Sequence, residues 1–269
     1  MCANILGQTT DFPDEYAPEV LFAMPRSEGR SALGIESLLP FDGVDIWNAW
    51  ELTWLDDSGK PVAGTVRMQV NADSPNIVES KSLKLYLGSF AMTQYESAID
   101  VMKIIGKDVA DAVDCSIDIA IWTKLRERAR TIRDVPGENI DQESMTRFAG
   151  DVDPELLSAA GESVSETLNT HLLRSLCPVT GQPDFGSLMI QYRGPQIDRS
   201  SLLDYVVSFR RHQDFHESCV ERIFLDVKAR CRPEALTVYA CYTRRGGIDI
   251  NPFRTDANVT PPSGRFWRQ

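Results

Sequence analysis

Residues 78–90 read VESKSLKLYLGSF and residues 197–209 read IDRSSLLDYVVSF, so one pattern occurs twice at a constant offset of 119 residues. Five positions are identical in the two stretches, namely Ser82/Ser201, Leu83/Leu202, Tyr86/Tyr205, Ser89/Ser208 and Phe90/Phe209. Two amphipathic helices could agree by chance, but a helical apolar face does not require shared serine and tyrosine residues. We therefore interpret the repeat as two related structural modules in one chain.

The residues around each copy of the repeat predict the same order of elements: two strands, two helices and a further strand. Alternating apolar residues predict the strands, and apolar residues three and four positions apart predict the helices. In the first half we expect strands at 45–55 and 66–70, helices at 80–90 and 95–112, and a strand at 113–121. In the second half we expect strands at 163–173 and 187–192, helices at 200–211 and 217–230, and a strand at 235–243. This order predicts an α+β fold.

Composition divides the chain into four parts. Residues 1–40 are rich in proline, serine, glycine and acidic residues, and we expect them to form an extended N-terminal arm. Residues 41–123 hold the first module and residues 162–269 the second. Residues 124–161 are polar and charged with few large apolar side chains, which is typical of a linker region.

The charge of the chain argues against a nucleic-acid partner. Its 269 residues carry a formal net charge of −11 and give a pI near 4.8, and a surface of this sign repels a phosphate backbone. We find no apolar run of the about 20 residues that span a bilayer, and no pattern typical of a secretory signal. We therefore expect a cytoplasmic protein that acts on a small, uncharged substrate, with no membrane partner.

The cysteines and histidines give no ligand spacing for a metal ion. The six cysteines are Cys2, Cys115, Cys177, Cys219, Cys231 and Cys241, and the three histidines are His171, His212 and His216. The cysteines lack a CxxC pair and are irregularly spaced, whereas structural zinc sites show paired ligands at short spacing. We expect reduced thiols and no metal.

The stretch SLCPVTGQPDFG, residues 175–186, is the strongest candidate for a reactive loop. Two prolines and two glycines fix an irregular loop between two expected strands, and loops on a rigid scaffold often carry reactive groups. Cys177 begins this loop and Asp184 ends it. The alternative is that Cys177 is a small buried apolar residue, which is the usual role of a free cysteine.

Two further stretches combine titratable residues with an expected helix start. Residues 214–218, DFHES, place His216 beside Glu217, where they could transfer protons or bind a planar ligand. Residues 79–86, ESKSLKLY, begin the helix of the first repeat. In both stretches acidic or polar capping of a helix is a sufficient explanation when each is taken alone.

Taken together, residues 177–185 (CPVTGQPDF), 215–217 (FHE) and 79–86 closely resemble the motifs of the 7-cyano-7-deazaguanine reductases of the QueF type. The resemblance covers roughly residues 45–255. This family has a long form with the signature motif in its first half and the nucleophile in its second, which is the order found here. The resemblance implies two tandem tunnelling-fold modules, each an antiparallel sheet with a pair of helices packed on one face, and a homodimer.

The resemblance implies an NADPH-dependent nitrile reductase of queuosine biosynthesis, a tRNA modification pathway. Such an enzyme reduces the nitrile of 7-cyano-7-deazaguanine to 7-aminomethyl-7-deazaguanine. Cys177 would be the nucleophile that forms a thioimidate, Asp184 the proton donor and His216 a second proton-handling group. The resemblance further assigns Ile77, Val78, Glu79, His216 and Glu217 to the substrate, and Ser80, Lys81, Arg245 and Gly246 to NADPH.

The reaction sets demands on these residues. Cys177 must react as a thiolate, because the thiol is a poor nucleophile. Asp184 must be protonated when it acts, so we expect burial to raise its pKa. Each NADPH carries one hydride, so the reduction needs two NADPH per turnover. Because no GxGxxG motif follows a strand, we expect NADPH in a surface groove near Lys81 and Arg245.

Three other functions stay open on the residues alone. A zinc-dependent cyclohydrolase of the same superfamily would need a Cys/His metal set, for which the chain shows no ligand spacing. A cysteine-dependent hydrolase with Cys177 and His216 would convert the nitrile to an acid. A non-catalytic purine-binding module would need neither Cys177 nor Asp184 for its action.

Overall fold

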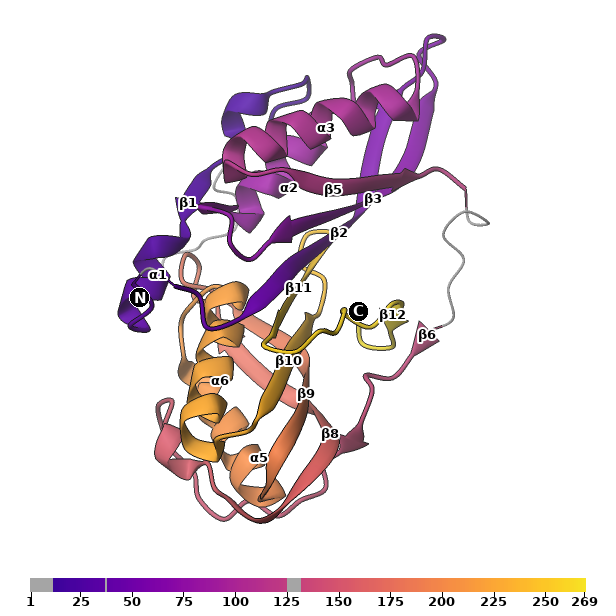
Figure 1. Cartoon of the computed structure of the whole chain (residues 1–269). Helices are drawn as coiled ribbons and strands as arrows, with labels where there is room; N and C mark the ends of the chain where they lie inside the picture. The colour runs from indigo at the N-terminus through magenta and orange to yellow at the C-terminus, as the bar shows by residue number, and fades with distance from the viewer. Residues whose placement is uncertain (1–11, 37, 125–131) are drawn as a thin grey trace, which may run out of the picture.

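The computed structural model describes residues 12–36, 38–124 and 132–269. One eight-stranded sheet passes through both halves of the chain (Figure 1), with its strands in the order β5-β3-β2-β11-β10-β9-β8-β7. Neighbouring strands are antiparallel except β7 and β8, which are parallel. The strand bounds are β2 Asp42–Leu55, β3 Pro61–Asn71, β5 Ile117–Trp122, β7 Glu138–Asn139, β8 Ala159–Leu176, β9 Pro183–Ile197, β10 Ala235–Tyr242 and β11 Ile248–Thr255.

Two pairs of helices cover one face of this sheet (Figure 1). Helices α2 (Ser80–Gly88) and α3 (Ala98–Val113) pack on the first half, and α5 (Arg199–Ser208) and α6 (His216–Cys231) pack on the second. Each pair encloses its own apolar core against the strands. The α+β class and the two modules, each with a helix pair on one face, are therefore confirmed.

A capping residue at each end sets the bounds of helix α3, which differ by a few residues from the helix expected at 95–112. Ser97 caps its start, since the backbone N–H of Asp100 donates to Ser97 Oγ at 3.3 Å. At its end Asp114 adopts a left-handed conformation with φ 53°, which stops the helix after Val113. Strand β5 therefore starts at Ile117, later than the expected strand at 113–121.

The polar residues shared by the two repeats make equivalent contacts in the two halves. Tyr86 donates to Asp108 at 2.6 Å, and Tyr205 donates to Asp226 at 2.7 Å. The hydroxyl oxygens of the shared serines accept hydrogen bonds from backbone N–H groups of the segment beside each helix. In the first half the N–H of Phe22 donates to Ser82 (3.0 Å) and that of Ala17 to Ser89 (3.1 Å). In the second half the N–H of Ser158 donates to Ser201 (3.1 Å) and that of Asp153 to Ser208 (3.4 Å). This explains why the repeat retains serine and tyrosine and not merely apolar residues.

The two halves are joined edge to edge by strand β11, which the sequence pattern did not predict. It pairs with β2 over eight residues, from Asp42 opposite Thr255 to Ala49 opposite Ile248. The Pro252 in its middle lacks an N–H and is rare in central strands, so it hid the strand signal. The expected sheets of the two modules thus form one continuous sheet.

The short elements of the N-terminal arm bind both halves. They are a 3-10 helix at Pro18–Val20, β1 (Ala23–Pro25) and α1 (Arg26–Ala32), and β1 pairs with β4 (Asn76–Val78). Arg26 and Arg30 of α1 are buried in a network of ion pairs, Arg26–Asp45 (2.6 Å), Asp45–Arg254 (2.8 Å), Arg254–Glu221 (2.9 Å) and Glu221–Arg30 (2.8 Å). The network links β2 of the first half to β11 and α6 of the second.

The opposite face of the sheet is covered over the second half. Here Val135 and Phe266 pack on Met189, Tyr239 and Phe253. They come from the expected linker and from the C-terminal segment, where β6 (Ile132–Arg133) and β12 (Arg265–Phe266) pair in parallel. Two short 3-10 helices, Pro154–Leu156 and Phe209–Arg211, complete the elements of the second half.

Candidate active site

A narrow cavity of about 20 Å³ lies where the two halves meet. The second half contributes most of its wall, and the first half contributes the segment that leads into α2. The described residues that line it are Ile77, Val78, Ser80, Cys177, Pro178, Asp184, Asp214, Phe215, His216, Glu217, Arg245 and Ile250. The structure therefore brings together most of the site residues that the motifs suggested, from positions more than a hundred residues apart.

Cys177 is held at the start of a tight turn between β8 and β9. Its backbone N–H donates to Gln182 O at 2.9 Å, and its own carbonyl accepts from Gly181 N–H at 2.9 Å. Gly181 has φ 67°, a conformation that costs glycine little and other residues more. Gln213 Nε2 also donates to Cys177 O at 3.1 Å. The backbone of Cys177 is thus fixed on both sides of the turn.

The surroundings of Cys177 favour the thiolate. Partial burial raises the pKa of the thiol, but hydrogen bonds from the Thr180 side chain and from the backbone of Thr180 and Val179 lower it, as does the charge of Arg245. The lowering effects prevail, so the pKa of Cys177 lies below its ordinary value. This fits the nucleophile that the resemblance implies better than an inert buried cysteine.

Asp184 lies at the start of β9 between the side chains of Arg245 and His216. Its carboxylate accepts a hydrogen bond from Arg245 Nη1 through Oδ1, and its Oδ2 lies 3.6 Å from His216 Nε2. Burial raises the pKa of Asp184, whose exposed fraction is 3%. His216 and Arg245 lower this pKa by more than burial raises it, so the pKa of Asp184 lies below its ordinary value. The expectation of a raised pKa was wrong for the free protein, because the effects of His216 and Arg245 on Asp184 outweigh burial.

His216 and Glu217 begin helix α6. The His216 ring contacts Tyr242, with ring centroids 3.9 Å apart. The Glu217 side chain is buried, and its Oε1 accepts a hydrogen bond from Trp47 Nε1 at 3.3 Å. Burial and the nearby charge of Asp45 raise the pKa of Glu217, although His216 and Arg26 oppose them. Capping of helix α6 would not by itself explain why the Glu217 carboxylate is buried in the wall of the cavity.

Three expected site residues adjoin the cavity without appearing among its lining residues. Glu79 caps α2 instead, since its carboxylate accepts from Lys81 N–H at 2.9 Å and Ser82 N–H at 2.8 Å. Lys81 is exposed on the first turn of α2, next to Ser80 of the cavity. Gly246 follows Arg245 in the β10–β11 turn. The capping explanation therefore accounts for the observed position of Glu79.

Sequence reasoning missed four of the lining residues and one residue that acts on the thiol. Pro178 and the pair Asp214 and Phe215 stood in the quoted motifs without a role. Ile250 lies on the unpredicted β11, where the alternation of Ile248, Asp249 and Ile250 was the available signal. Thr180, whose hydroxyl bonds to the thiol, is visible in the motif but could be assigned only with the turn geometry.

Neither a metal centre nor a membrane-spanning helix is found among the described residues. In the parts of the chain that the structure describes, no group of three or more His, Cys, Asp and Glu side chains is placed to hold a metal ion. Across residues 12–36, 38–124 and 132–269, no helix combines the length and the apolar character needed to cross a membrane.

Comparison with known proteins gives two family matches. The profile described as nitrile reductase, 7-cyano-7-deazaguanine reductase N-terminal part, matches residues 12–121, and the profile of QueF-like proteins matches residues 183–260. Proteins named NADPH-dependent 7-cyano-7-deazaguanine reductase from Burkholderia multivorans and Burkholderia vietnamiensis are each 49% identical over 98% of this chain and 97% of their own. The chain belongs to the QueF family of 7-cyano-7-deazaguanine reductases.

The family match agrees with the resemblance of the motifs. The relative from Burkholderia orbicola is also 49% identical, over 98% of both chains. Among solved structures, the archaeosine synthase QueF-Like in the apo form matches 38% of this chain and 99% of its own, at 17% identity and a TM-score of 0.32. The two QueF profiles cover the two halves that share the continuous sheet, in the order of the long form of the family.

The residues at the mouth of the site fit the NADPH of this QueF family member. Lys84 lies over Gly246, where a Cβ would come within 2.5 Å of Lys84 Cδ, and Gly246 has φ 58°. Only a glycine at position 246 allows the Lys84 side chain to lie this close to the turn. Lys81 is exposed on the same helix as Lys84, α2. Lys81, Lys84 and Arg245 give cations for phosphate groups within an acidic protein.

Proposed function

We propose that this chain reduces the nitrile of 7-cyano-7-deazaguanine to 7-aminomethyl-7-deazaguanine with NADPH, in queuosine biosynthesis, through a covalent thioimidate on Cys177. The observation that carries the proposal is that one cavity of the described chain holds residues of both halves. Cys177, Asp184, His216 and Glu217 of the second half line it together with Ile77, Val78 and Ser80 of the first. Membership of a family whose named relatives are NADPH-dependent 7-cyano-7-deazaguanine reductases supports the substrate and the cofactor.

The reaction begins with the thiolate of Cys177. Its lowered pKa increases the thiolate fraction near neutral pH, and the rigid turn holds the sulfur at the cavity wall. The thiolate forms a bond to the nitrile carbon, and the electron pair of one C–N π bond moves to the nitrile nitrogen. That nitrogen takes a proton, which gives a neutral thioimidate.

Asp184 and His216 hold the proton that the nitrogen needs. Because the pKa of Asp184 is lowered in the free chain, its carboxylate is ionised at neutral pH, and its Oδ2 lies 3.6 Å from His216 Nε2. In this proposal His216 supplies the proton, and Asp184 orients the imidazole and passes the proton to the substrate. Arg245 keeps Asp184 fixed during the transfer.

Ser80, Lys81, Arg245 and Gly246 hold the cofactor at the mouth of the cavity. NADPH supplies hydride when bound, and conversion of a nitrile to an amine takes four electrons, so two NADPH are consumed per substrate. After the first reduction the C–S bond breaks, the thiolate of Cys177 leaves and an imine remains for the second reduction. The charge of Arg245 stabilises the departing thiolate, as it does in the free protein.

Glu217 binds the guanine-like edge of the substrate. Neighbouring N–H groups of that edge can donate to the two oxygens of one carboxylate. Trp47 already donates to Oε1 and fixes the carboxyl group in place. His216, Ile77 and Val78 line the remaining wall, with Phe215 beside them. Glu79 fixes the start of α2, which positions Val78 and Ser80 at the substrate.

Several wider properties belong to the same proposal. The enzyme works as a homodimer in the cytoplasm, needs no metal and binds no nucleic acid, which suits its net charge of −11. Residues 41–123 and 162–269 are its two modules, with an arm at 1–40 and a linker at 124–161. The family profiles, at residues 12–121 and 183–260, fall one in each half of the chain.

The test measures how much NADPH is consumed for each molecule of nitrile substrate, with the product mass recorded, in wild type, Cys177→Ala and Cys115→Ala. We expect two NADPH per substrate and an amine from wild type and from Cys115→Ala, and no turnover from Cys177→Ala. Asp184→Asn is expected to lower kcat by about 10²–10⁴-fold. An acid product without NADPH loss would instead establish a cysteine hydrolase.

A further inference from the structure

The β10–β11 turn directs two adjacent arginines to opposite faces of the sheet. Arg245 lines the catalytic cavity, where it donates to Asp184 and, at 2.7 Å, to Gln182 Oε1. The guanidinium group of the preceding Arg244 instead lies 5.4 Å from the ring centroid of Trp50 in β2. Because successive residues of an extended chain point to opposite faces, a shift by one residue would bring Arg244 to the catalytic cavity and turn Arg245 away from it.

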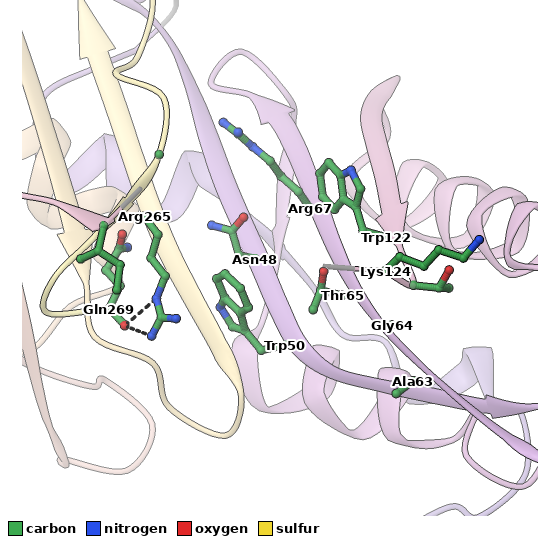
Figure 2. Close-up of a pocket in the computed structure, with 13 residues that line it drawn as sticks. Asn48, Trp50, Ala63, Gly64, Thr65, Arg67, Trp122, Lys124, Arg265 and Gln269 are labelled. Atoms are coloured by element: carbon green, nitrogen blue, oxygen red, sulfur yellow. Dashed lines mark hydrogen bonds between the residues drawn. The ribbon is translucent and has the colours of Figure 1, made fainter. Parts of the chain in front are cut away.

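Trp50 lies on the face of the sheet opposite the helices. Trp47 and Ala49 of β2 are buried in the apolar core of the first half, so the alternate residues Asn48 and Trp50 project from the other face. Figure 2 shows Asn48 and Trp50 beside Arg265 of the C-terminal segment. The guanidinium group of Arg265 lies 5.1 Å from the Trp50 ring, within the distance of about 6 Å at which a cation and an aromatic face attract.

A β-bulge brings the backbone of Trp50 to the turn. The register of β2 against β3 shifts between Ala49 and Leu52, so β2 holds one extra residue at positions 50 and 51. Bulges change the direction of a strand and of its side chains. Next to this bulge, the backbone N–H of Trp50 donates to Gly247 O at 2.9 Å. The first half of the chain thus holds the tip of the turn through its main chain.

Asp249 fixes the indole of Trp50 to β11, just beyond the turn. Its side chain is buried, and its carboxylate accepts hydrogen bonds from Trp50 Nε1 (2.6 Å), Asn48 Nδ2 (2.7 Å) and Asn251 Nδ2 (2.7 Å). A buried carboxylate is costly unless donors surround it, so these bonds favour one position of the indole. Trp50 is therefore held by its main chain at Gly247 and by its side chain at Asp249.

The turn itself is too short to absorb a displacement. Arg245 and Ile248 exchange both backbone hydrogen bonds, at 3.0 Å and 3.1 Å, so only Gly246 and Gly247 form the turn. These glycines have φ 58° and 79°, as a two-residue turn with positive φ at both positions requires. The direction of Arg245 is therefore set by the groups that hold its neighbours, Arg244 and Gly247.

We propose that Trp50 is a positioning residue for the reaction at Cys177, because it holds Arg244 and Gly247 and so directs Arg245 at Asp184. The assignment rests on the proposed function, in which Arg245 fixes Asp184 and stabilises the thiolate of Cys177. Trp50 does not line the catalytic cavity. It acts on the reaction only through Arg245, from the other half of the chain.

The first test needs no turnover and measures the alkylation of Cys177 by iodoacetamide at pH 7, followed by mass spectrometry. The charge of Arg245 favours the thiolate, so Trp50→Leu should slow alkylation severalfold, and Arg245→Gln should slow it at least as much. A loss of packing alone would instead expose the thiol and speed its alkylation. Arg244 is exposed, so Arg244→Gln should slow alkylation too and carries the test if Trp50→Leu does not fold.

Two further variants separate the aromatic contact from a general effect on the sheet. Trp50→Phe keeps an aromatic face for Arg244 and should restore most of the wild-type alkylation rate. The matched control is Trp122→Leu, which removes an indole from β5 in the same cavity wall (Figure 2) and should react like wild type.

A double-mutant cycle then connects Trp50 to Arg245. Trp50→Leu should lower kcat/KM for the nitrile substrate severalfold in the wild-type background and cause no further loss in Arg245→Gln. Equal losses in the two backgrounds would overturn the proposal, as would wild-type alkylation rates in both Trp50→Leu and Arg244→Gln. If these variants slow alkylation but wild type does not reduce the nitrile, the proposed function fails and the positioning of Arg245 by Trp50 stands.

Discussion

At the scale of single residues, the candidate site holds two acidic groups, Cys177 and Asp184, whose pKa values are both lowered in the free protein. Burial alone would favour the neutral thiol of Cys177 and the neutral carboxyl of Asp184. Arg245 contributes to lowering the pKa of both, and Thr180 and His216 each act on one of them. If Cys177 is the nucleophile that we propose, its surroundings favour the thiolate before the substrate arrives.

The first prediction concerns the hydroxyl of Thr180. Thr180→Val removes a hydrogen bond that stabilises the thiolate, so the pKa of Cys177 should rise and its alkylation by iodoacetamide near pH 7 should slow severalfold. The measurement is the alkylation rate of Cys177 against pH, followed by mass spectrometry. Thr180→Ser keeps the hydroxyl and should retain the wild-type profile. An unchanged midpoint in Thr180→Val would show that Thr180 does not control the thiolate.

A second prediction follows from the raised pKa of Glu217. Between the ordinary pKa of a glutamate and the raised value, the folded state holds a proton that the unfolded state releases, so stability falls as the pH rises through that window. Glu217→Gln keeps the shape of the side chain and an oxygen for Trp47 and removes this cost. We expect it to be about 0.5–2 kcal/mol more stable at pH 8 and no more stable at low pH.

The same substitution should damage substrate binding, because an amide offers one acceptor where the carboxylate offers two. The KM for the nitrile substrate should rise at least roughly tenfold. Urea unfolding at several pH values and steady-state kinetics test the two effects. If Glu217→Gln is less stable than wild type at every pH, the buried carboxylate does not destabilise the folded protein, and the prediction is wrong.

At the scale of elements, the helices and the first hairpin followed from the sequence because their signals are local. The strand pairs β2–β3 and β8–β9, the helix starts and the shared serines all appear in patterns of a few residues. Strand β11 did not, because Asn251 and Pro252 interrupt its alternation and its pairing with β2 joins residues about two hundred positions apart. The lowered pKa of Asp184 was missed for a related reason, since it depends on Arg245 in the distant β10–β11 turn.

The third prediction belongs to the buried ion network that links α1, β2, β11 and α6. Arg254 is fully buried and pairs with both Asp45 and Glu221. Arg254→Met leaves each carboxylate short of a partner, which we expect to cost about 3–5 kcal/mol in the free energy of urea unfolding. The matched control is Arg193→Met, which breaks the exposed pair with Glu234 and should cost at most about 1 kcal/mol. Equal losses in the two variants would contradict a structural role for the network.

At the scale of the whole molecule, the duplicated fold provides two similar turns, and Cys177 lies in the second of them. In the first half Asp56 N–H donates to Lys60 O at 2.9 Å and Gly59 N–H donates to Asp56 O at 2.8 Å. Cys177 makes the corresponding pair of bonds in the second half, in a turn that is one residue longer. Leu55 and Leu176 make equivalent bridges to Gln94 and Gln213. Asp56 thus occupies in the first half the position that Cys177 occupies in the second. The two halves have diverged, because the second contributes Cys177 to the cavity and the first contributes Ile77, Val78 and Ser80.

Because both halves line the cavity, their relative position must be fixed. The boundary between β2 and β11, called the seam below, fixes it. Eight residue pairs join β2 to β11, and the buried ion network crosses the same boundary. Each half nevertheless has its own apolar core and its own buried tyrosine–aspartate pair. If the pairing across the seam couples the unfolding of the two halves, a mutation that destabilises one core lowers the stability of both halves.

The equivalent tyrosines allow a matched test of this coupling. Tyr86→Phe and Tyr205→Phe each remove one hydrogen bond to a carboxylate without changing the packed ring, at a cost of about 1.5–3 kcal/mol. Hydrogen exchange followed by mass spectrometry reports the opening free energies of β3 and β9 separately. We expect each variant to lower both by the same amount, because opening one half removes the partner of the other along β2 and β11. If each variant weakens its own half alone, the halves open independently, and the geometry of the shared site would have to be maintained by bound ligand.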